Sequence, residues 1–141
     1  FCNFVCPFIT MGKMIIYSFM GELRWKRIYD TAEEEDGFRI LIDRLWPRGV
    51  GKAAAQLGAW ARDVAPSAAL RSAFHKNEAD YKTFAESYEK ELHDNDEMTE
   101  FIKEIKNKLK TGNVTFLYAS REPEHSQIPV LRSFIEKRLK E

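Results

Sequence analysis

The residues best suited to chemistry lie in one short stretch, residues 39–49, with the sequence RILIDRLWPRG. An apolar run there leads into a polar segment that carries Asp43, Arg44, Trp46 and Arg48. A guanidinium group matches the geometry of phosphate and carboxylate, which it binds through two parallel hydrogen bonds. The stretch therefore predicts an anion-binding site in which Arg44 and Arg48 hold the anion and Trp46 offers a platform on which a ligand could stack.

A second polar cluster follows the apolar segment 114–119 and comprises Ser120, Arg121, Glu122, Glu124 and His125. If the two apolar segments are parallel neighbours, both clusters open at the same edge of a sheet, where open α/β sheets bind their ligands. We expect Arg121 to join the anion site there. His125, whose imidazole can serve as an acid or a base, and Asp43 are the candidates for moving protons.

Several of these residues also have a purely structural interpretation. In a regular strand Asp43 and Arg44 point to opposite faces, so either one can form a structural ion pair instead. Trp46 suits the core as well as the wall of a cavity. His75 ends a short predicted helix, where a cation suits the helix dipole. Ser120 lacks the Gly-x-Ser-x-Gly turn that presents a nucleophilic serine.

Three apolar segments predict the strands that would position these clusters, at residues 23–29, 38–45 and 114–119. The first alternates apolar and basic residues, which is typical of a half-buried strand. The middle of the second is a continuous run of Ile and Leu, which is typical of burial on both faces. Helical segments separate the strands, so we expect an α/β fold: a small, largely parallel sheet with helices packed on it, and rich in helix.

The helices are predicted from alanine content, capping residues and the spacing of apolar side chains. Residues 53–61 favour a helix that ends before Pro66, because the residue before a proline avoids the helical region. The side chains expected to cap or to begin the later helices are Ser67, Asn77, Asp96 and Pro129. The acidic stretch 30–37 is rich in turn-forming residues and predicts a loop.

The composition sets limits on the function. The 141 residues fit one domain, and 22 basic residues balance 22 acidic ones. A zero net charge disfavours, without excluding, a protein that binds nucleic acid, because such domains usually carry a basic excess. The chain has no glycine-rich phosphate loop and no dinucleotide fingerprint, so we expect no cofactor.

The two cysteines, Cys2 and Cys6, do not form a disulfide framework and have no second pair of metal ligands nearby. We therefore expect a reducing, cytoplasmic setting and no metal site. Residues 1–20 are predicted to be an extension ahead of a single domain at 21–141, with 14–20 at most an added edge strand. Asn3, Pro7 and Lys13 interrupt the apolar run, which argues against a membrane anchor.

From Lys26 onward the chain resembles the DUF488 family of small bacterial proteins, in its YeaO-like branch. The resemblance rests on the runs RIYD at 27–30 and DGFRILIDRLWPRG at 36–49, and on positions such as Trp60, Tyr88 and Leu117. It implies an α/β domain and a polar cluster of Asp43, Arg44, Arg48, Ser67, Arg71 and His125, without an established reaction. The chain departs from the family pattern after His125, where it has Ser126, Gln127 and Pro129.

Three hypotheses follow. The first is a small α/β domain with an arginine-rich pocket for a phosphorylated or nucleotide-like anion, with or without hydrolytic or transferase activity. The second is a non-enzymatic domain that recognises nucleic acid or a protein. In the third, Asp43, Arg44 and Arg71 form a buried charge network that only stabilises the fold. The sequence leaves the oligomeric state open.

Overall fold

Four parallel strands form the sheet in the computed structural model, which describes residues 21–141, and their order is β1-β4-β2-β3. Their bounds are Leu23–Arg27 for β1, Phe38–Leu41 for β2, Ala59–Trp60 for β3 and Val114–Tyr118 for β4. Phe38 aligns with Val114 and Leu41 with Leu117. The second and third predicted strands are therefore parallel neighbours, as the predicted site requires, and the predicted α/β fold is confirmed.

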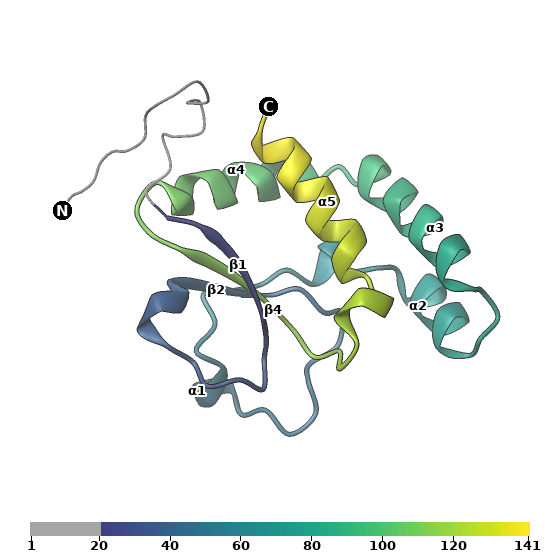
Figure 1. Ribbon diagram of the computed structural model, residues 1–141, viewed down its shortest axis with the longest axis horizontal. Coiled ribbons are helices and arrows are strands. Elements are labelled where there is room, and N and C mark those ends of the chain that lie inside the picture. Colours follow the sequence, from purple (N-terminus) through teal and green to yellow (C-terminus); the bar gives the residue numbers. More distant parts are fainter. Residues whose placement is uncertain (1–20) are drawn as a thin grey trace.

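Five α-helices accompany the sheet in the described part of the chain: α1 (Lys52–Ala55), α2 (Ala68–His75), α3 (Tyr81–Asp94), α4 (Met98–Leu109) and α5 (Ile128–Leu139). Three short 3-10 turns lie at Glu34–Asp36, Arg62–Val64 and Pro123–His125. Figure 1 shows α4 and α5 over one side of the sheet and the short α1 on the other. The helices α2 and α3 lie beyond the carboxyl ends of the strands (Figure 1).

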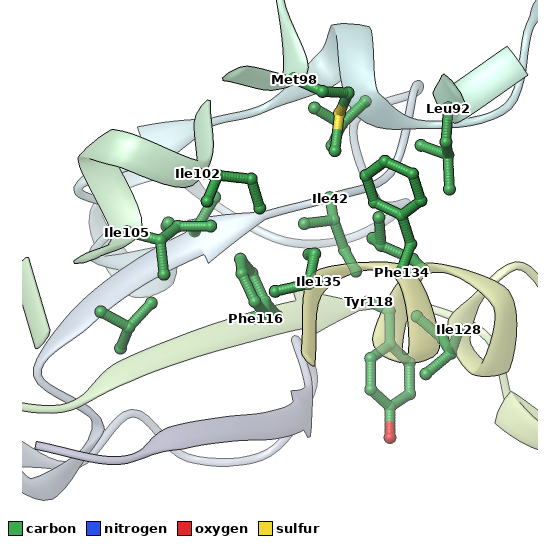
Figure 2. Packing of buried hydrophobic residues seen from close by; sticks show 14 of the residues in the cluster. Ile42, Leu92, Met98, Ile102, Ile105, Phe116, Tyr118, Ile128, Phe134 and Ile135 are labelled. Carbon is green, nitrogen blue, oxygen red and sulfur yellow. The ribbon is translucent and has the colours of Figure 1, made fainter. Parts of the chain in front are cut away.

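The alternation of side chains along β4 divides the core between the two faces of the sheet. Val114, Phe116 and Tyr118 pack into the larger cluster with residues of α3, α4 and α5. Figure 2 shows Phe116 beside Ile42 and Ile135 in this cluster. Leu117 points to the opposite face and joins a smaller cluster with Ile28, Leu41 and Ala55. All five residues of β4 are buried, which fits its position between β1 and β2 at the centre of the sheet.

A charged cluster lies at the amino end of β2 and consists of Asp36, Lys26 and Arg39; we call it the Asp36 cluster. Asp36 is fully buried and accepts hydrogen bonds from Lys26 Nζ at 3.0 Å and from the guanidinium of Arg39. Burial by itself would raise the pKa of Asp36, but bonds from the Glu33 backbone N–H, Lys26 and Arg39 lower it below the usual 3.8. The sequence predicted only a loop over 30–37 and missed this cluster.

The predicted helix at 53–61 is wrong after its first residues. The helix α1 ends at Ala55, and Ala59 and Trp60 form the edge strand β3 beside Ile40 and Leu41. Gly58 explains the change, because a Cβ atom there would come within 2.3 Å of the Phe38 ring. Close packing of the chain against β2 therefore outweighs the helix propensity of the alanines.

Two of the predicted helix starts are confirmed and two are wrong. The Ser67 hydroxyl accepts the Leu70 N–H as the cap of α2, and Pro129 lies in the first turn of α5. Asp80, rather than Asn77, caps α3 by accepting the Thr83 N–H. Asn77 instead takes a positive φ of 61° in the preceding turn, and α4 begins after Glu97 without a side-chain cap from Asp96.

The expectations for the extension at 1–20, its edge strand and the two cysteines lie outside the described residues. Within residues 21–141, no helix is long and apolar enough to cross a membrane.

Candidate anion site

A cavity of about 520 Å³ opens where β1, β2 and β4 end. The residues that follow these strands, Tyr29, Asp43 and Ser120, all line it. This placement is expected for a parallel sheet, in which neighbouring strands present their carboxyl ends at one edge. The charged and titratable side chains predicted for the site that line the cavity are Asp43, Arg44, Arg48, Arg71, Arg121 and His125.

Asp43 joins the ends of β2 and β4. Its Oδ2 accepts the Ala119 backbone N–H at 2.9 Å, and its Oδ1 accepts Gln127 Nε2 at 2.9 Å. Burial raises the pKa of Asp43, and these two bonds, together with the charge of Arg71, offset the effect only in part. Because the carboxylate takes the N–H of Ala119 from the backbone ladder, β2 ends at Leu41 rather than at Leu45 as predicted.

The early end of β2 also changes where Asp43 and Arg44 point. Alternation along a regular strand would send the two side chains to opposite faces, yet both line the cavity because the backbone there is not a strand. Arg44 nevertheless directs its guanidinium at the backbone, donating from Nε to the Pro66 carbonyl at 2.7 Å and from Nη2 to the Ala65 carbonyl at 3.3 Å.

Residues 64–67, which precede α2, form hydrogen bonds with side chains from other parts of the chain. Besides the two bonds from Arg44, the Tyr88 hydroxyl donates to the Val64 carbonyl at 2.6 Å. The carboxylate of Glu91 accepts both the Ser67 N–H at 2.9 Å and the Ser67 hydroxyl at 2.6 Å. Burial, together with the charges of Glu91 and Asp43, raises the pKa of Tyr88 well above 10.0, so the phenol remains a donor. The helix α2 therefore starts from a rigid anchor.

Ser67 itself faces a different space. It lines a neighbouring cavity of about 510 Å³, which Arg44 also borders, and is not among the residues around the Asp43 cavity. Its hydroxyl caps α2 and donates to Glu91. The structure thus separates Ser67 from the predicted site residues other than Arg44.

Arg71 extends from α2 into the cavity and is half-buried. Among the described residues, its side chain has no hydrogen bond and no carboxylate within 4.0 Å, although its charge acts on Asp43. The predicted buried network of Asp43, Arg44 and Arg71 is therefore not formed as ion pairs. Asp43 accepts hydrogen bonds from neutral donors, and the guanidinium of Arg44 donates to backbone carbonyls. The five N–H donors of Arg71 therefore remain available to other partners.

Arg48, Arg121 and His125 lie on the rim and are exposed. Their side chains make no hydrogen bond among the described residues, and the His125 ring lies 5.0 Å from the Tyr81 ring. Arg48 sits in a turn whose next residue, Gly49, has a φ of 78°, which favours glycine. His75, at the end of α2, lines the same cavity, so its structural position does not separate it from the site.

Trp46 serves both the core and the cavity. It packs on the smaller core cluster, its ring meets Trp60 edge to face at 5.4 Å, and it also lines the cavity. Its Nε1 donates to the Val50 carbonyl at 2.7 Å, which closes the loop that carries Arg48. Trp60 Nε1 donates in turn to the Asp43 carbonyl at 2.7 Å.

Sequence reasoning missed Tyr29, Arg27 and Gln127. The Tyr29 hydroxyl donates to the Arg48 carbonyl at 2.8 Å, and Arg27 donates to the carbonyls of Ala119 and Ser120. The strand-end argument, applied to the first strand as well, would have found Tyr29. No comparable signal marked Gln127, because its role depends on how α5 begins beside β2. Within residues 21–141, no group of three or more His, Cys, Asp or Glu side chains could hold a metal ion.

Comparisons with known proteins match nearly the whole of the part of the chain that the structure describes. The family model described as "Inactive DUF488-N3 subclade" matches residues 22–141. "Uncharacterized protein YeaO" from Escherichia coli is 38% identical over 113 residues, which cover 80% of this chain and 96% of that protein. "Uncharacterized protein Rv3073c" from Mycobacterium tuberculosis is 36% identical over 118 residues, 82% of this chain and 95% of that protein. No solved structure matches the chain significantly.

Proposed function

Because this chain belongs to the DUF488 family, with its match in a subclade described as inactive, we propose that it is a receptor for a small anion rather than an enzyme. The anion is a phosphate or a phosphate ester, and it occupies the cavity at the carboxyl ends of β1, β2 and β4. Arg71 is the principal ligand, with Arg48 and Arg121 closing over the anion from the rim.

One observation carries the proposal: Arg71 is a half-buried residue that lines the cavity, and its guanidinium has no partner among the described residues. None of its nitrogens is a buried atom without a partner, so the guanidinium is open to the cavity and can bind an anion through two parallel hydrogen bonds. The other strongly held cations of the chain, such as Arg39 and Arg44, have their partners within the protein. Arg71 lacks one, and an anionic ligand would supply it.

The charges around the cavity support the same ligand. Four arginines line it, Arg44, Arg48, Arg71 and Arg121, against the single carboxylate of Asp43. The overall chain is neutral, so this excess is local. A concave surface of one sign concentrates oppositely charged ligands and speeds their binding.

The role of Asp43 favours binding over catalysis. Both carboxylate oxygens accept hydrogen bonds that connect β2 to Ala119 and Gln127, so the group already has a structural task. A general base must instead reach the proton that it removes. The proton-transfer roles of Asp43 and His125 remain predictions from the sequence.

Calorimetry with inorganic phosphate and ribose 5-phosphate at low salt tests the proposal. We expect binding by the wild type and a loss of ten- to a hundredfold in Arg71→Ala, the range for one charge-assisted hydrogen bond. Lys76→Ala is the matched control, because it removes one positive charge at the end of the same helix from a residue outside the cavity. Its affinity should stay within a factor of two of the wild type.

Two outcomes would overturn the proposal. The first is an absence of binding to both compounds at millimolar concentration. The second is an equal loss in Arg71→Ala and Lys76→Ala, because it would show a general charge effect. A short DNA duplex serves as a third ligand, and tighter, strongly salt-dependent binding of the duplex would indicate a nucleic-acid protein instead.

A further inference from the structure

The large hydrophobic side chains that are exposed in the described chain lie together at the Asp43 cavity. Two large hydrophobic side chains stand out as exposed within residues 21–141, Tyr29 at 46% and Leu45 at 55%. Both line this cavity. Single exposed apolar residues are ordinary on a protein surface, but two that share the rim of one cavity form a binding feature.

The Tyr29 ring is held in place rather than left to move. Its hydroxyl donates to the Arg48 carbonyl at 2.8 Å, and the guanidinium carbon of Arg27 lies over the ring at 4.9 Å from its centroid. Arg27 is itself fixed by its bonds to the carbonyls of Ala119 at 2.8 Å and Ser120 at 3.0 Å. A ring oriented in this way, with nearly half of its surface exposed, is ready to receive another flat group at little entropic cost.

The size of the cavity and the distribution of its side chains call for more than an inorganic ion. A volume of about 520 Å³ falls within the range of small-molecule and cofactor sites. Arg71, whose guanidinium has no partner among the described residues, is half-buried as a residue, whereas Tyr29 and Leu45 are exposed. The ligand that matches this gradient has a charged end inside and a carbon-rich end at the mouth.

We infer that the anion carries an aromatic ring, and that the ligand class is a nucleoside monophosphate, with its phosphate at Arg71 and its base against Tyr29. This inference rests on the proposed function, because it assigns the remainder of the same ligand. The base and the tyrosine ring stack face to face or in an offset manner, and Leu45 covers the edge of the base. Stacking of this kind tolerates different bases, because every base has a π face.

Calorimetry with AMP, ribose 5-phosphate and adenosine separates the two ends of the ligand. We expect the wild type to bind AMP about tenfold more tightly than ribose 5-phosphate, the increment for stacking one base on an aromatic ring. Adenosine, which lacks the phosphate, should bind more weakly than either compound. Arg71→Ala should weaken AMP and ribose 5-phosphate by the same factor.

A pair of substitutions at Tyr29 isolates the ring from its hydroxyl. Tyr29→Phe and Tyr29→Leu both lose the bond to the Arg48 carbonyl, but only the first keeps an aromatic face. We expect Tyr29→Phe to keep the preference for AMP and Tyr29→Leu to reduce it to about twofold or less, with the affinity for ribose 5-phosphate equal in both. Leu45→Ala should weaken AMP severalfold and leave ribose 5-phosphate unchanged.

The possible failures are distinct. If AMP and ribose 5-phosphate bind equally, or if Tyr29→Leu keeps the full preference for AMP, the inference is overturned while anion binding stands. If none of the phosphorylated compounds binds, the proposed function itself fails. Tyr29 is exposed, so both variants should melt within a few degrees of the wild type, which thermal unfolding verifies.

Discussion

Asp36 and Asp43 lie at opposite ends of β2, and their surroundings differ in kind. Asp36 is fully buried between Lys26 and Arg39, and its pKa is lowered. Asp43 is half-buried, accepts only from the neutral donors Ala119 N–H and Gln127, and its pKa is raised. The amino end of the strand therefore pairs its charges within the protein, whereas the carboxyl end leaves a guanidinium facing a cavity.

This difference separates stability from binding along a single strand. Charged groups that are paired inside the fold are not available to bind a ligand. Removing one member of such a pair leaves the other as an unpaired charge in the protein interior. The cavity end keeps its cations available because other donors, N–H and amide, hold Asp43. The contrast predicts that substitutions at the two ends affect different measurements.

The largest effect is expected at the Asp36 cluster. Asp36→Asn leaves the buried Arg39 without its counter-charge, which should lower the free energy of unfolding by about 3–5 kcal/mol. Urea denaturation followed by circular dichroism measures the change. Glu34→Gln, an exposed acid on the same 3-10 turn, is the control and should cost less than about 0.5 kcal/mol. Equal losses of unfolding free energy in the two variants would contradict the prediction, because they would show that the buried Asp36 stabilises the fold no more than an exposed acid does.

The next effect in size concerns the anchor of α2. Arg44→Ala removes the donor of two carbonyls, those of Ala65 and Pro66, and both residues are buried. We expect a loss of about 1–3 kcal/mol, the cost of leaving buried acceptors unsatisfied. Arg48→Ala, whose side chain makes no hydrogen bond within the described chain, should lie within about 0.5 kcal/mol of the wild type. The order would be reversed if Arg44 were a ligand residue and Arg48 a structural one.

The two aspartates should also respond to pH in opposite directions. The lowered pKa of Asp36 means that its stabilisation is present above 3.8 and is lost as the pH falls through the folded-state value. Because the pKa of Asp43 is raised in the folded protein, its ionisation destabilises the fold at pH values above the folded-state pKa. As the pH falls from that pKa towards 3.8, protonation of Asp43 in the folded protein removes this destabilisation. On acidification, wild type should lose its advantage over Asp36→Asn and gain relative to Asp43→Asn, as urea titrations would show. If both differences in unfolding free energy, wild type against Asp36→Asn and wild type against Asp43→Asn, changed with pH in the same direction, the predicted contrast between the two aspartates would be wrong.

The smallest effect on stability is expected at the cation that faces the cavity. Arg71→Ala breaks no hydrogen bond within the described chain, so its free energy of unfolding should stay within about 0.5 kcal/mol of the wild type. The same variant should lose the rise in melting temperature that millimolar ribose 5-phosphate gives the wild type. A loss of several kcal/mol without any ligand would place Arg71 with Arg39 as a structural residue.

The elements that could be predicted from the sequence are those whose signal is local. The apolar runs of β2 and β4 and the Ser67 cap depend on neighbouring residues, and their strand-end polar clusters do lie together as predicted. The helix predicted over 53–61 failed because the contact between Gly58 and the Phe38 ring is distant in sequence. Local propensity cannot represent such packing.

The details of the site depend on contacts that no local pattern contains. The prediction that Asp43 and Arg44 point to opposite faces of the sheet assumed that the strand continues to Leu45. The bond between Asp43 and the Ala119 N–H spans 76 positions and ends the strand early. Likewise, the Asp36 cluster requires Lys26 from β1, which an inspection of the acidic stretch 30–37 could not supply.

The order of the strands has a consequence for how this chain acquires its structure during synthesis. β4 lies between β1 and β2 and bonds to both, while β1 and β2 do not pair with each other. Until residues 114–118 have left the ribosome, β1 therefore has no partner strand and β2 can pair only with the two-residue β3. Nascent chains that stop before that point should remain sensitive to proteases, and the final collapse should follow the emergence of the fourth strand, as the slow formation of long-range parallel pairs would suggest.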